Sequence, residues 1–398
     1  MYLMILGRQP ALSIAELERV FGGKNVNVLS PIAATINTDS FDIQKLGGTL
    51  KAGKIVAELP GNDWYKINQK IISQFIDEWS SSTGKITLGI SVYGARVSTR
   101  DIQKTGLILK RKLKEQDVSL RLVPNSEPSL NTATSHHNKL GLSPNKVEII
   151  VVATAKTTYI ATSTGAQNIT AYANRDQKRP KRDAFVGMLP PKLAQIMINL
   201  ACGPVPPTNY QLPPTILDPF CGTGVILQEA ALIGYDVYGT DLSEKMVDYS
   251  QINLEWLHDR HHVDFKFKLD QGDAMTTRWK KPIDAVVSET YLGQPFSAPP
   301  SHVKLEEVVG NCNHIATEFL KNISSQIEPG TPLCIAVPAW RGKDGRTTHL
   351  PFIEKIARLG YKPHEFTNIS QKDLLYFRED QVVARELLVL TKVQANFA

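Results

Sequence analysis

The spacing of apolar residues differs between the first and second parts of the chain. In residues 1–60, strand-like apolar runs accompany one helix-like stretch at 13–22, which Gly22 and Gly23 bring to an end. Residues 61–165 repeat this mixture. The expected elements are strands at 1–6, 33–38, 54–60 and 85–94, helices at 63–79 and 101–116, and two strands within 146–165. The pattern predicts two consecutive α+β domains.

The pattern changes at residues 166–185, where apolar residues no longer recur at a regular spacing and charged residues are more frequent. We therefore expect a linker there. From 186 to 398, strand-like and helix-like stretches alternate, which is typical of a parallel, doubly wound α/β sheet. The expected strands are 215–220, 236–241, 265–273, 283–289 and 331–338, with helices at 189–201, 224–234, 243–257, 313–327 and 352–360. The closing stretches 364–370 and 384–393 are expected to form an antiparallel hairpin at the sheet edge.

Composition adds constraints on class and compartment. The 398 residues include 42% hydrophobic and 21% charged residues, which is ordinary for a globular protein with several cores. The apolar run at the N-terminus has no basic residue before it, so neither a signal peptide nor a membrane span is expected. None of the four cysteines has a partner at C-x-x-C spacing, so we expect no metal site, no disulfide framework and a cytoplasmic location. The net charge of +6 permits a polyanionic partner without requiring one.

The strongest chemical signal is the stretch LDPFCGTGVI at residues 217–226. A strand ends at Asp218, and Gly222 and Gly224 allow a tight turn into a helix, so the backbone can approach a ligand where a Cβ would clash. A dinucleotide fingerprint needs a third glycine where this chain has Leu227, and an acidic residue in the turn repels pyrophosphate. The motif therefore favours a cationic, amine-bearing ligand over a nicotinamide cofactor.

Acidic residues also follow the next two expected strands. Asp241 ends the second strand, where its carboxylate can accept hydrogen bonds from both hydroxyls of a ribose. Asp273 and the backbone of Ala274 end the third strand and can contact the edge of an adenine. Cys221 is expected to be an inert small residue in the tight turn. The full set of candidate cofactor residues is Asp218, Pro219, Cys221, Gly222, Gly224, Asp241, Leu242, Asp273 and Ala274.

The stretch DPFCGTG resembles motif I of S-adenosylmethionine-dependent methyltransferases. Together with motif I, the segments 3–22, 175–201 and 385–390 resemble the THUMP-domain RNA methyltransferases that act on the exocyclic N2 of guanine at position 10 of tRNA. The resemblance extends over most of the chain. It implies S-adenosylmethionine as the cofactor, tRNA as the partner, and methylation of a guanosine N2 at position 10 as the reaction.

The same resemblance implies an order of domains along the chain. It places a ferredoxin-like domain at 1–60 and a THUMP-like RNA-binding domain at 61–165. A basic linker at 166–185 then leads to a Rossmann-like methyltransferase domain at 186–398. We expect a monomer, and the sequence leaves open whether an accessory subunit is needed.

The expected linker carries a cluster of cations that suits a polyanion. Its members, within eight residues and beside the single acid Asp176, are Arg175, Lys178, Arg179, Lys181 and Arg182. Such groups contact phosphates, and they provide affinity and salt dependence rather than sequence choice. They are candidate RNA-binding residues, and the alternative is a solvated strap between domains.

Residues 284–293, DAVVSETYLG, occupy the place of the catalytic loop in this resemblance. Amino-methyltransferases of this type carry an aspartate, two prolines and an aromatic residue followed by glycine there. Aligned without gaps, Glu289 takes the place of the aspartate, and Thr290 and Tyr291 replace the prolines. A second register puts Ser288 at the polar position and Tyr291 at the aromatic one. The candidate catalytic residues are therefore Glu289, Ser288 and Tyr291, and the first register is preferred because it keeps the strand length and the glycine.

Three function classes stay open from the sequence. The first is a tRNA guanine-N2 methyltransferase, and the second is an amino-methyltransferase of another RNA, DNA or protein target. The third is a catalytically silent RNA-binding protein, which only the altered loop favours. The RNA-binding character expected of the first half favours the first class. The sequence leaves open which nucleotide is modified and whether it receives one methyl group or two.

Overall fold

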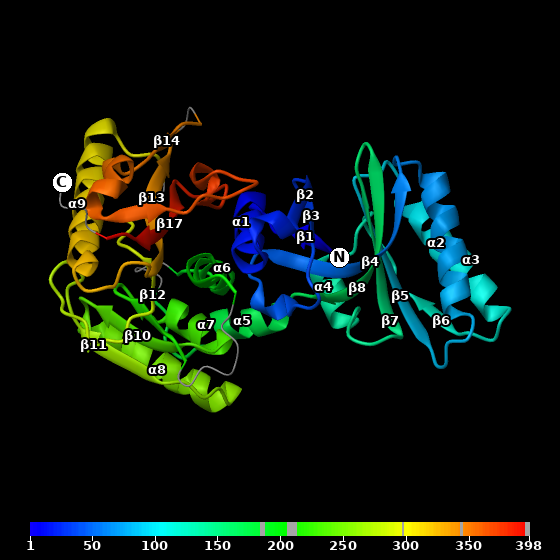
Figure 1. Cartoon of the computed structure of the whole chain (residues 1–398). Helices are drawn as coiled ribbons and strands as arrows, with labels where there is room; N and C mark the ends of the chain where they lie inside the picture. Colours follow the sequence, from blue (N-terminus) through cyan, green and yellow to red (C-terminus); the bar gives the residue numbers. More distant parts are fainter. Residues whose placement is uncertain (184–187, 205–212, 297, 343–344, 395–398) are drawn as a thin grey trace. The chain divides into compact units, whose positions relative to one another are not determined.

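The computed structural model describes residues 1–183, 188–204, 213–296, 298–342 and 345–394 (Figure 1). The end of the expected linker, 184–185, and the start of the expected methyltransferase domain, 186–187, lie outside the described residues. Contacts divide the chain into two compact units. Unit 1 comprises 1–10, 25–44 and 49–171, and unit 2 comprises 11–24, 45–48 and 172–398. Unit 2 therefore takes in two short segments from the N-terminal part of the chain.

Unit 1 is built on one eight-stranded sheet in the order β2-β3-β1-β4-β8-β7-β5-β6. Its strands are β1 (Tyr2–Leu6), β2 (Val26–Ser30), β3 (Ala33–Ile36), β4 (Thr49–Pro60), β5 (Ile86–Tyr93), β6 (Leu120–Leu122), β7 (Lys146–Ala153) and β8 (Thr157–Ala166), and its helices are α2 (Trp64–Trp79), α3 (Thr99–Lys114) and α4 (Thr132–His137). The long strand β4 pairs antiparallel with both β1 and β8. One sheet thus joins the strands of the expected domains 1–60 and 61–165, and the boundary between those domains stays a prediction.

Helix α2 shows how the apolar pattern of unit 1 becomes packing. Asp63 caps the helix by accepting a hydrogen bond from the Tyr65 amide at 2.9 Å. Ile67, Ile71 and Phe75 follow at four-residue spacing, so they share one side of the helix. That side packs with α3 and with buried residues of β5 and β7. The helix expected in this stretch is confirmed.

Unit 2 is built on a nine-stranded sheet whose main path is β11-β10-β9-β12-β13-β17-β15, with β14 paired to β13 and β16 paired to β17. Its strands are β9 (Thr215–Asp218), β10 (Asp236–Asp241), β11 (Phe267–Gln271), β12 (Ala285–Glu289), β13 (Pro332–Arg341), β14 (Thr347–Thr348), β15 (Tyr361–Pro363), β16 (Leu375–Tyr376) and β17 (Val383–Lys392). Its helices are α1 (Pro10–Phe21), α6 (Pro191–Cys202), α7 (Val225–Ile233), α8 (Glu244–His261) and α9 (His302–Ser324). Strands β9 to β13 run parallel, which confirms the expected parallel sheet.

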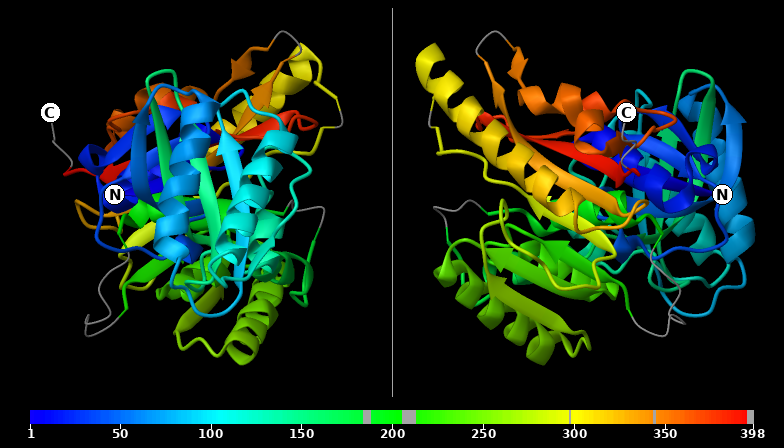
Figure 2. Two further views of the ribbon diagram at one scale, coloured as in Figure 1. Left: turned by 90° about the vertical axis from the view of Figure 1, so that its right-hand side faces the viewer. Right: turned by 60° about the vertical axis from the view of Figure 1, so that its left-hand side comes forward.

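Alternating residues of the parallel strands face two separate cores. Ile216 and Val287 join the core that contains α6, α7 and α8, whereas Leu217 and Val286 join the core that contains α9. Figure 2 shows α9, in yellow, running along β13, in orange. Helices therefore cover both faces of the sheet, and the doubly wound architecture is confirmed.

Helix α1 belongs to unit 2, although the sequence predicts it as part of the N-terminal domain. Its Glu16 carboxylate accepts hydrogen bonds from the Gly47 and Gly48 amides, both at 2.8 Å, and from Asn199 of α6 at 2.7 Å. Burial raises the pKa of Glu16 to about 7. Arg19 donates to the last carbonyl groups of α6. These polar contacts explain why α1 belongs to unit 2.

Three local expectations differ from the structure. The expected linker contains helix α5 (Ile169–Gln177), and the helix expected at 352–360 is of the 3-10 type, η3 (Pro351–Leu359). The other 3-10 helices of the described residues are η1 (Gly23–Asn25), η2 (Ile43–Lys45) and η4 (Gln371–Asp373). Strand β17 lies between β13 and β15 rather than at the sheet edge, and 364–370 forms no strand. The interior position suits β17 because Leu387 and Leu388 are both buried, on opposite faces.

Candidate active site

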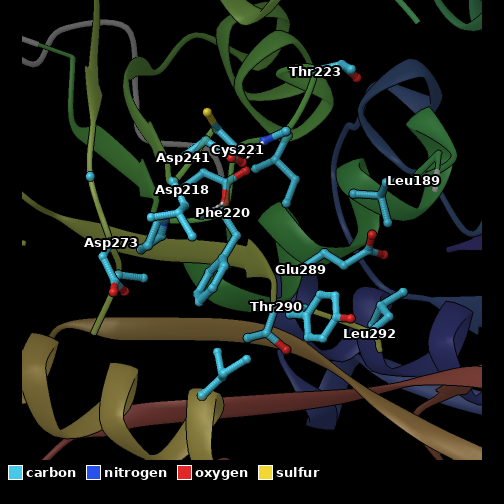
Figure 3. Close-up of a pocket in the computed structure, with 18 of the residues that line it drawn as sticks. Leu189, Asp218, Phe220, Cys221, Thr223, Asp241, Asp273, Glu289, Thr290 and Leu292 are labelled. Carbon is cyan, nitrogen blue, oxygen red and sulfur yellow. Dashed lines mark hydrogen bonds between the residues drawn. The ribbon is translucent and has the colours of Figure 1, made fainter. Parts of the chain in front are cut away.

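The candidate site is a pocket of about 540 Å³ at the carboxyl ends of the parallel strands of unit 2. Loops after β9, β10, β11 and β12 line it, and Leu189 and Ile315 add apolar walls. Sheet order reverses here, because β10 lies on one side of β9 and β12 on the other. Ligands of open α/β sheets bind at such a reversal. Figure 3 shows Asp218, Asp241 and Asp273 on one side of the pocket and Glu289 on the other.

The glycine-rich turn after β9 has the backbone that the sequence predicts. Gly222 and Gly224 adopt φ values of +51° and +78°, in the left-handed region that favours glycine. A Cβ on Gly224 would also come within 2.9 Å of the Ser250 hydroxyl. Helix α7 begins directly after Gly224. Gly222 lines the pocket, whereas Gly224 shapes the turn from outside the lining.

Asp218 lies at the end of β9 and is only 1% exposed. Its Oδ1 accepts hydrogen bonds from the Ser288 hydroxyl at 2.6 Å and from the Phe220 amide at 3.2 Å. Burial raises the pKa of this carboxyl to about 7, and the nearby charges of Asp241 and Glu289 act in the same direction. Asp218 therefore exchanges its proton near neutral pH, and a cation bound beside it favours the ionised form.

Two further acidic residues reach the pocket from β10 and β11. Asp241 uses both oxygens locally, because Oδ2 accepts from the Gly222 amide and Oδ1 from the Ser243 amide, each at 2.9 Å. Burial raises the pKa of Asp241. Asp273 accepts a hydrogen bond from the Met275 amide at 2.8 Å. Each carboxylate keeps lone pairs for a ligand, because two oxygens offer about four acceptor sites.

Every candidate cofactor residue from the sequence except Gly224 lines this pocket: Asp218, Pro219, Cys221, Gly222, Asp241, Leu242, Asp273 and Ala274. Phe220 also lines it and packs edge-on against Phe319, with ring centroids 5.2 Å apart. Phe220 lies within the motif at 217–226, so the sequence could have identified it as a candidate pocket residue. The sequence could not identify Leu189 and Ile315 as pocket residues, because they lie far from the motif along the chain and reach it only in the folded structure.

The expected catalytic loop starts at Glu289, the last residue of β12, whose side chain lines the pocket. Glu289 forms an ion pair through Oε1 with Nε of Arg385 in β17. The Thr290 amide donates to the Ala336 carbonyl at 2.9 Å, so the loop begins tied to β13. Tyr291 lines the pocket and is 44% exposed. These contacts hold a loop that lacks the two prolines.

Ser288 takes a different position from Glu289. Its side chain is fully buried, its hydroxyl is directed at Asp218, and it does not line the pocket. The structure thus separates the two candidate polar residues of the loop. Of the three candidate catalytic residues, Glu289 and Tyr291 line the pocket and Ser288 does not.

The predicted cluster of linker cations is only partly available at the surface. The Arg175 guanidinium pairs with Glu229 at 2.7 and 3.0 Å and lies over the Tyr172 ring. Arg179 is 3% exposed, and its nearest carboxylate is Asp176 at 3.9 Å. Neither guanidinium is free for a phosphate in this structure, because Arg175 on α5 is paired with Glu229 and Arg179, two residues after α5, is buried.

The remaining three cations of the cluster stay accessible. Lys178 and Arg182 are exposed, and Lys181 is half-buried with its ammonium group 5.2 Å from the centre of the Tyr249 ring. The Lys181 backbone is anchored, because its amide donates to Asn253 at 2.9 Å. An anchored backbone with accessible cations suits contact with phosphates.

Within the described residues, no group of three or more His, Cys, Asp or Glu side chains could hold a metal ion. The four cysteines are free, and burial raises the pKa of the Cys221 thiol well above its usual range. A buried, protonated thiol is a poor nucleophile. No helix in the described part of the chain is long and apolar enough to cross a membrane.

Comparison with known proteins places the site in a methyltransferase domain. Residues 181–318 match the family described as UPF0020, RMKL-like, methyltransferase domain. The tRNA (guanine(10)-N2)-dimethyltransferase of Methanothermobacter thermautotrophicus is 33% identical over 165 residues, which cover 41% of this chain and 43% of that protein. The protein of the same name from Pyrococcus abyssi is 43% identical over 125 residues, which cover 31% of each. The chain thus spans less than half the length of these relatives. The part that resembles a methyltransferase domain, 181–318, overlaps the domain expected from residue 186 onward.

A solved structure shares the fold over nearly the whole chain. The crystal structure of TrmN from Thermus thermophilus matches 98% of this chain and 99% of that chain, with a TM-score of 0.53 and 16% sequence identity. At this identity the match shows the fold alone. It includes the N-terminal part of the chain, which the family match does not reach.

Proposed function

We propose that the chain methylates the exocyclic N2 of a guanosine in tRNA, at position 10, with S-adenosylmethionine as the methyl donor. The observation that carries the proposal is one pocket in which Asp218, Asp241 and Asp273 lie opposite Glu289. The acidic side suits a cofactor that bears an amine and a ribose. The names of the two archaeal relatives support guanosine 10 of tRNA as the target.

The pocket residues fit this cofactor in their chemistry. Asp218 is a buried carboxyl with a pKa near 7, which a cationic amino group would ionise. Asp241 lies at the end of β10, where its carboxylate can accept ribose hydroxyls. Asp273 and the Ala274 backbone are placed for the adenine edge. When bound, the cofactor supplies a methyl group on a cationic sulfur.

The chain's own contribution to methyl transfer lies at Glu289 and Tyr291. An exocyclic amine conjugated with its ring is a poor nucleophile, and it improves as the nitrogen becomes tetrahedral. A carboxylate that accepts its N–H bonds stabilises that change and the positive charge that develops. Glu289 is the pocket residue at the end of β12 that can do this. The partly exposed Tyr291 ring can stack on a guanine drawn out of its helix.

The placement of Ser288 supports the first register of the catalytic loop. Its hydroxyl donates to Asp218 from a buried position, so it acts on the cofactor side of the pocket. We therefore assign catalysis to Glu289 and a supporting hydrogen bond to Ser288.

We also propose that the first half of the chain binds tRNA. We keep the ferredoxin-like and THUMP-like assignments for 1–60 and 61–165. Helix α3 supports them, because it exposes a series of cations, namely Lys104, Lys110, Arg111, Lys112 and Lys114. A monomer in the cytoplasm completes the proposal.

The proton on Asp218 makes cofactor affinity depend on pH. Its pKa is about 7 in the free protein, and a cationic ligand binds the ionised form. The dissociation constant for S-adenosylmethionine should therefore fall about fivefold between pH 6 and pH 7, with release of a proton. Calorimetry in buffers of different ionisation enthalpy measures both. Asp218→Asn should remove the pH dependence, and a wild-type affinity that stays level over this range would contradict the role of Asp218.

The accessible linker cations should contribute to tRNA affinity. Replacing Lys178, Lys181 and Arg182 with glutamine should weaken tRNA binding and flatten the slope of log K against log salt by up to about 2–3. A filter-binding titration at several salt concentrations gives both values. The matched control removes three exposed cations elsewhere in unit 2, namely Lys355, Arg358 and Lys372. If affinity and slope equal those of the control, the linker connects the domains without contacting tRNA.

Transfer of radiolabelled methyl from S-adenosylmethionine to unmodified tRNA tests the proposed activity. The full chain should label a total tRNA pool and should leave DNA and protein unlabelled. Label in DNA or protein alone would favour another amino-methyltransferase. Tight binding of tRNA without transfer would favour a silent RNA-binding protein.

A further inference from the structure

Glu289 reaches the pocket while one of its oxygens is already engaged. Oε1 accepts from Nε of Arg385, and Oε2 has no hydrogen-bond partner among the described residues. Arg385 is 7% exposed and does not line the pocket. It reaches Glu289 across strand β13, because β12 and β17 pair with opposite edges of β13.

We propose that Arg385 is the positioning residue for Glu289 in methyl transfer, an inference that rests on the proposed function. The guanidinium holds the carboxylate in one rotamer through Oε1 and leaves Oε2 for the acceptor amine. It thereby replaces the stiffness that two prolines would give the loop. Glutamate has one more rotatable bond than aspartate, so it gains more from such a clamp.

The surroundings of Arg385 make it a rigid support. Its strand, β17, pairs antiparallel with β13 over nine residue pairs, from Pro332↔Thr391 to Trp340↔Val383. The guanidinium also lies 6.0 Å from the centre of the Tyr376 ring, on β16. A buried arginine in a central strand moves little, so the carboxylate that it binds is fixed relative to the pocket.

The ion pair also balances charge in an acidic pocket. Four carboxyl groups line it, those of Asp218, Asp241, Asp273 and Glu289. Arg385 is the cation paired with the last of these. Removing it leaves a largely buried carboxylate uncompensated, and such a side chain turns to a new partner or to water. The expected result is a misdirected Glu289 rather than an unfolded chain.

A double-mutant cycle in the full chain tests this role. The variants are Arg385→Gln, Glu289→Ala and their combination, assayed by single-turnover methyl transfer to tRNA at saturating tRNA and cofactor. Arg385→Gln should lower the rate constant about 10- to 100-fold, the scale for misplacing a reacting group by about 1 Å. Cofactor affinity should not change. The double variant should be no slower than Glu289→Ala alone, because Arg385 acts only through the acceptor that Glu289→Ala removes.

Arg385→Lys and Lys392→Gln complete the design. Lysine keeps the charge without the fork, so Arg385→Lys should fall between the wild type and Arg385→Gln. If Arg385→Gln fails to fold, Arg385→Lys still tests the proposal. Lys392 is a buried cation on the same strand, whose ammonium group contacts the Gly360 carbonyl outside the pocket, so Lys392→Gln should keep the wild-type rate constant.

The outcomes separate this role from the proposed function. A wild-type rate in Arg385→Gln and Arg385→Lys, or losses that multiply in the double variant, would overturn the role of Arg385 alone. A faster Arg385→Gln would overturn it too, because the pair would then hold Glu289 away from the acceptor. No transfer by the unsubstituted chain would overturn the proposed function and, with it, this role.

Discussion

Glu289→Ala should lower the single-turnover rate of methyl transfer to unmodified tRNA on the order of 10²–10³-fold. The carboxylate lines the pocket at the end of β12. In the proposed mechanism it accepts a hydrogen bond from the guanine amine chiefly in the transition state. Ground-state binding hardly uses that contact, so the affinity for the cofactor should stay nearly intact. Rapid-quench measurements at saturating cofactor isolate the chemical step from product release.

Two conservative variants sharpen this test. Glu289→Gln should be milder than Glu289→Ala, because an amide oxygen still accepts although it no longer balances positive charge. Ser288→Ala should leave the rate constant close to wild type and act on cofactor affinity instead, since Ser288 donates to Asp218. If Glu289→Ala transfers methyl at the wild-type rate, the catalytic assignment is wrong. If Ser288→Ala matches the loss at Glu289, the second register is correct.

Asp241→Ala should weaken S-adenosylmethionine binding by roughly 1–3 kcal/mol, or about 5- to 150-fold in the dissociation constant. The variant removes the proposed acceptor for the ribose hydroxyls and also leaves the Gly222 amide, which donates to Asp241 at 2.9 Å, without that partner. Isothermal calorimetry measures the change directly.

The matched control for this prediction is Asp236→Ala. Asp236 begins the same strand and accepts a hydrogen bond from the Lys266 amide at 2.8 Å, outside the pocket. It should keep the wild-type affinity, and an Asp241 variant that does the same would remove Asp241 from the site. The full chain is the right material, because Glu16 and Arg19 of α1 hold helix α6, which a fragment starting at residue 186 would have to pack alone.

Local chemistry allowed the motif side of the site to be predicted from sequence. A glycine turn that needs positive φ and an acid at each strand end are short-range features, so Gly222, Asp218 and Asp241 stood out before folding was known. The alternation of strand-like and helix-like stretches likewise predicted the parallel sheet with helices on both faces, because this order repeats along the chain.

Partners distant in sequence could not be predicted in this way. Arg175 reads as a free cation in a basic stretch, yet 54 residues later the chain supplies Glu229 to neutralise it. Arg385 lies 96 residues after Glu289, so its support of the catalytic loop is invisible in the motif. The assignment of α1 to unit 2 likewise depends on Glu16 meeting Asn199 across 183 residues.

Mass spectrometry of nucleosides from tRNA incubated with the full chain and isotopically labelled S-adenosylmethionine tests the proposed activity most directly. The proposal predicts labelled N2-methylguanosine or N2,N2-dimethylguanosine, confined to position 10 when a single tRNA transcript is digested and mapped. The same transcript with adenosine at position 10 should stay unlabelled. Label at another base, label that persists in the substituted transcript, or no label across a complete tRNA pool would contradict it.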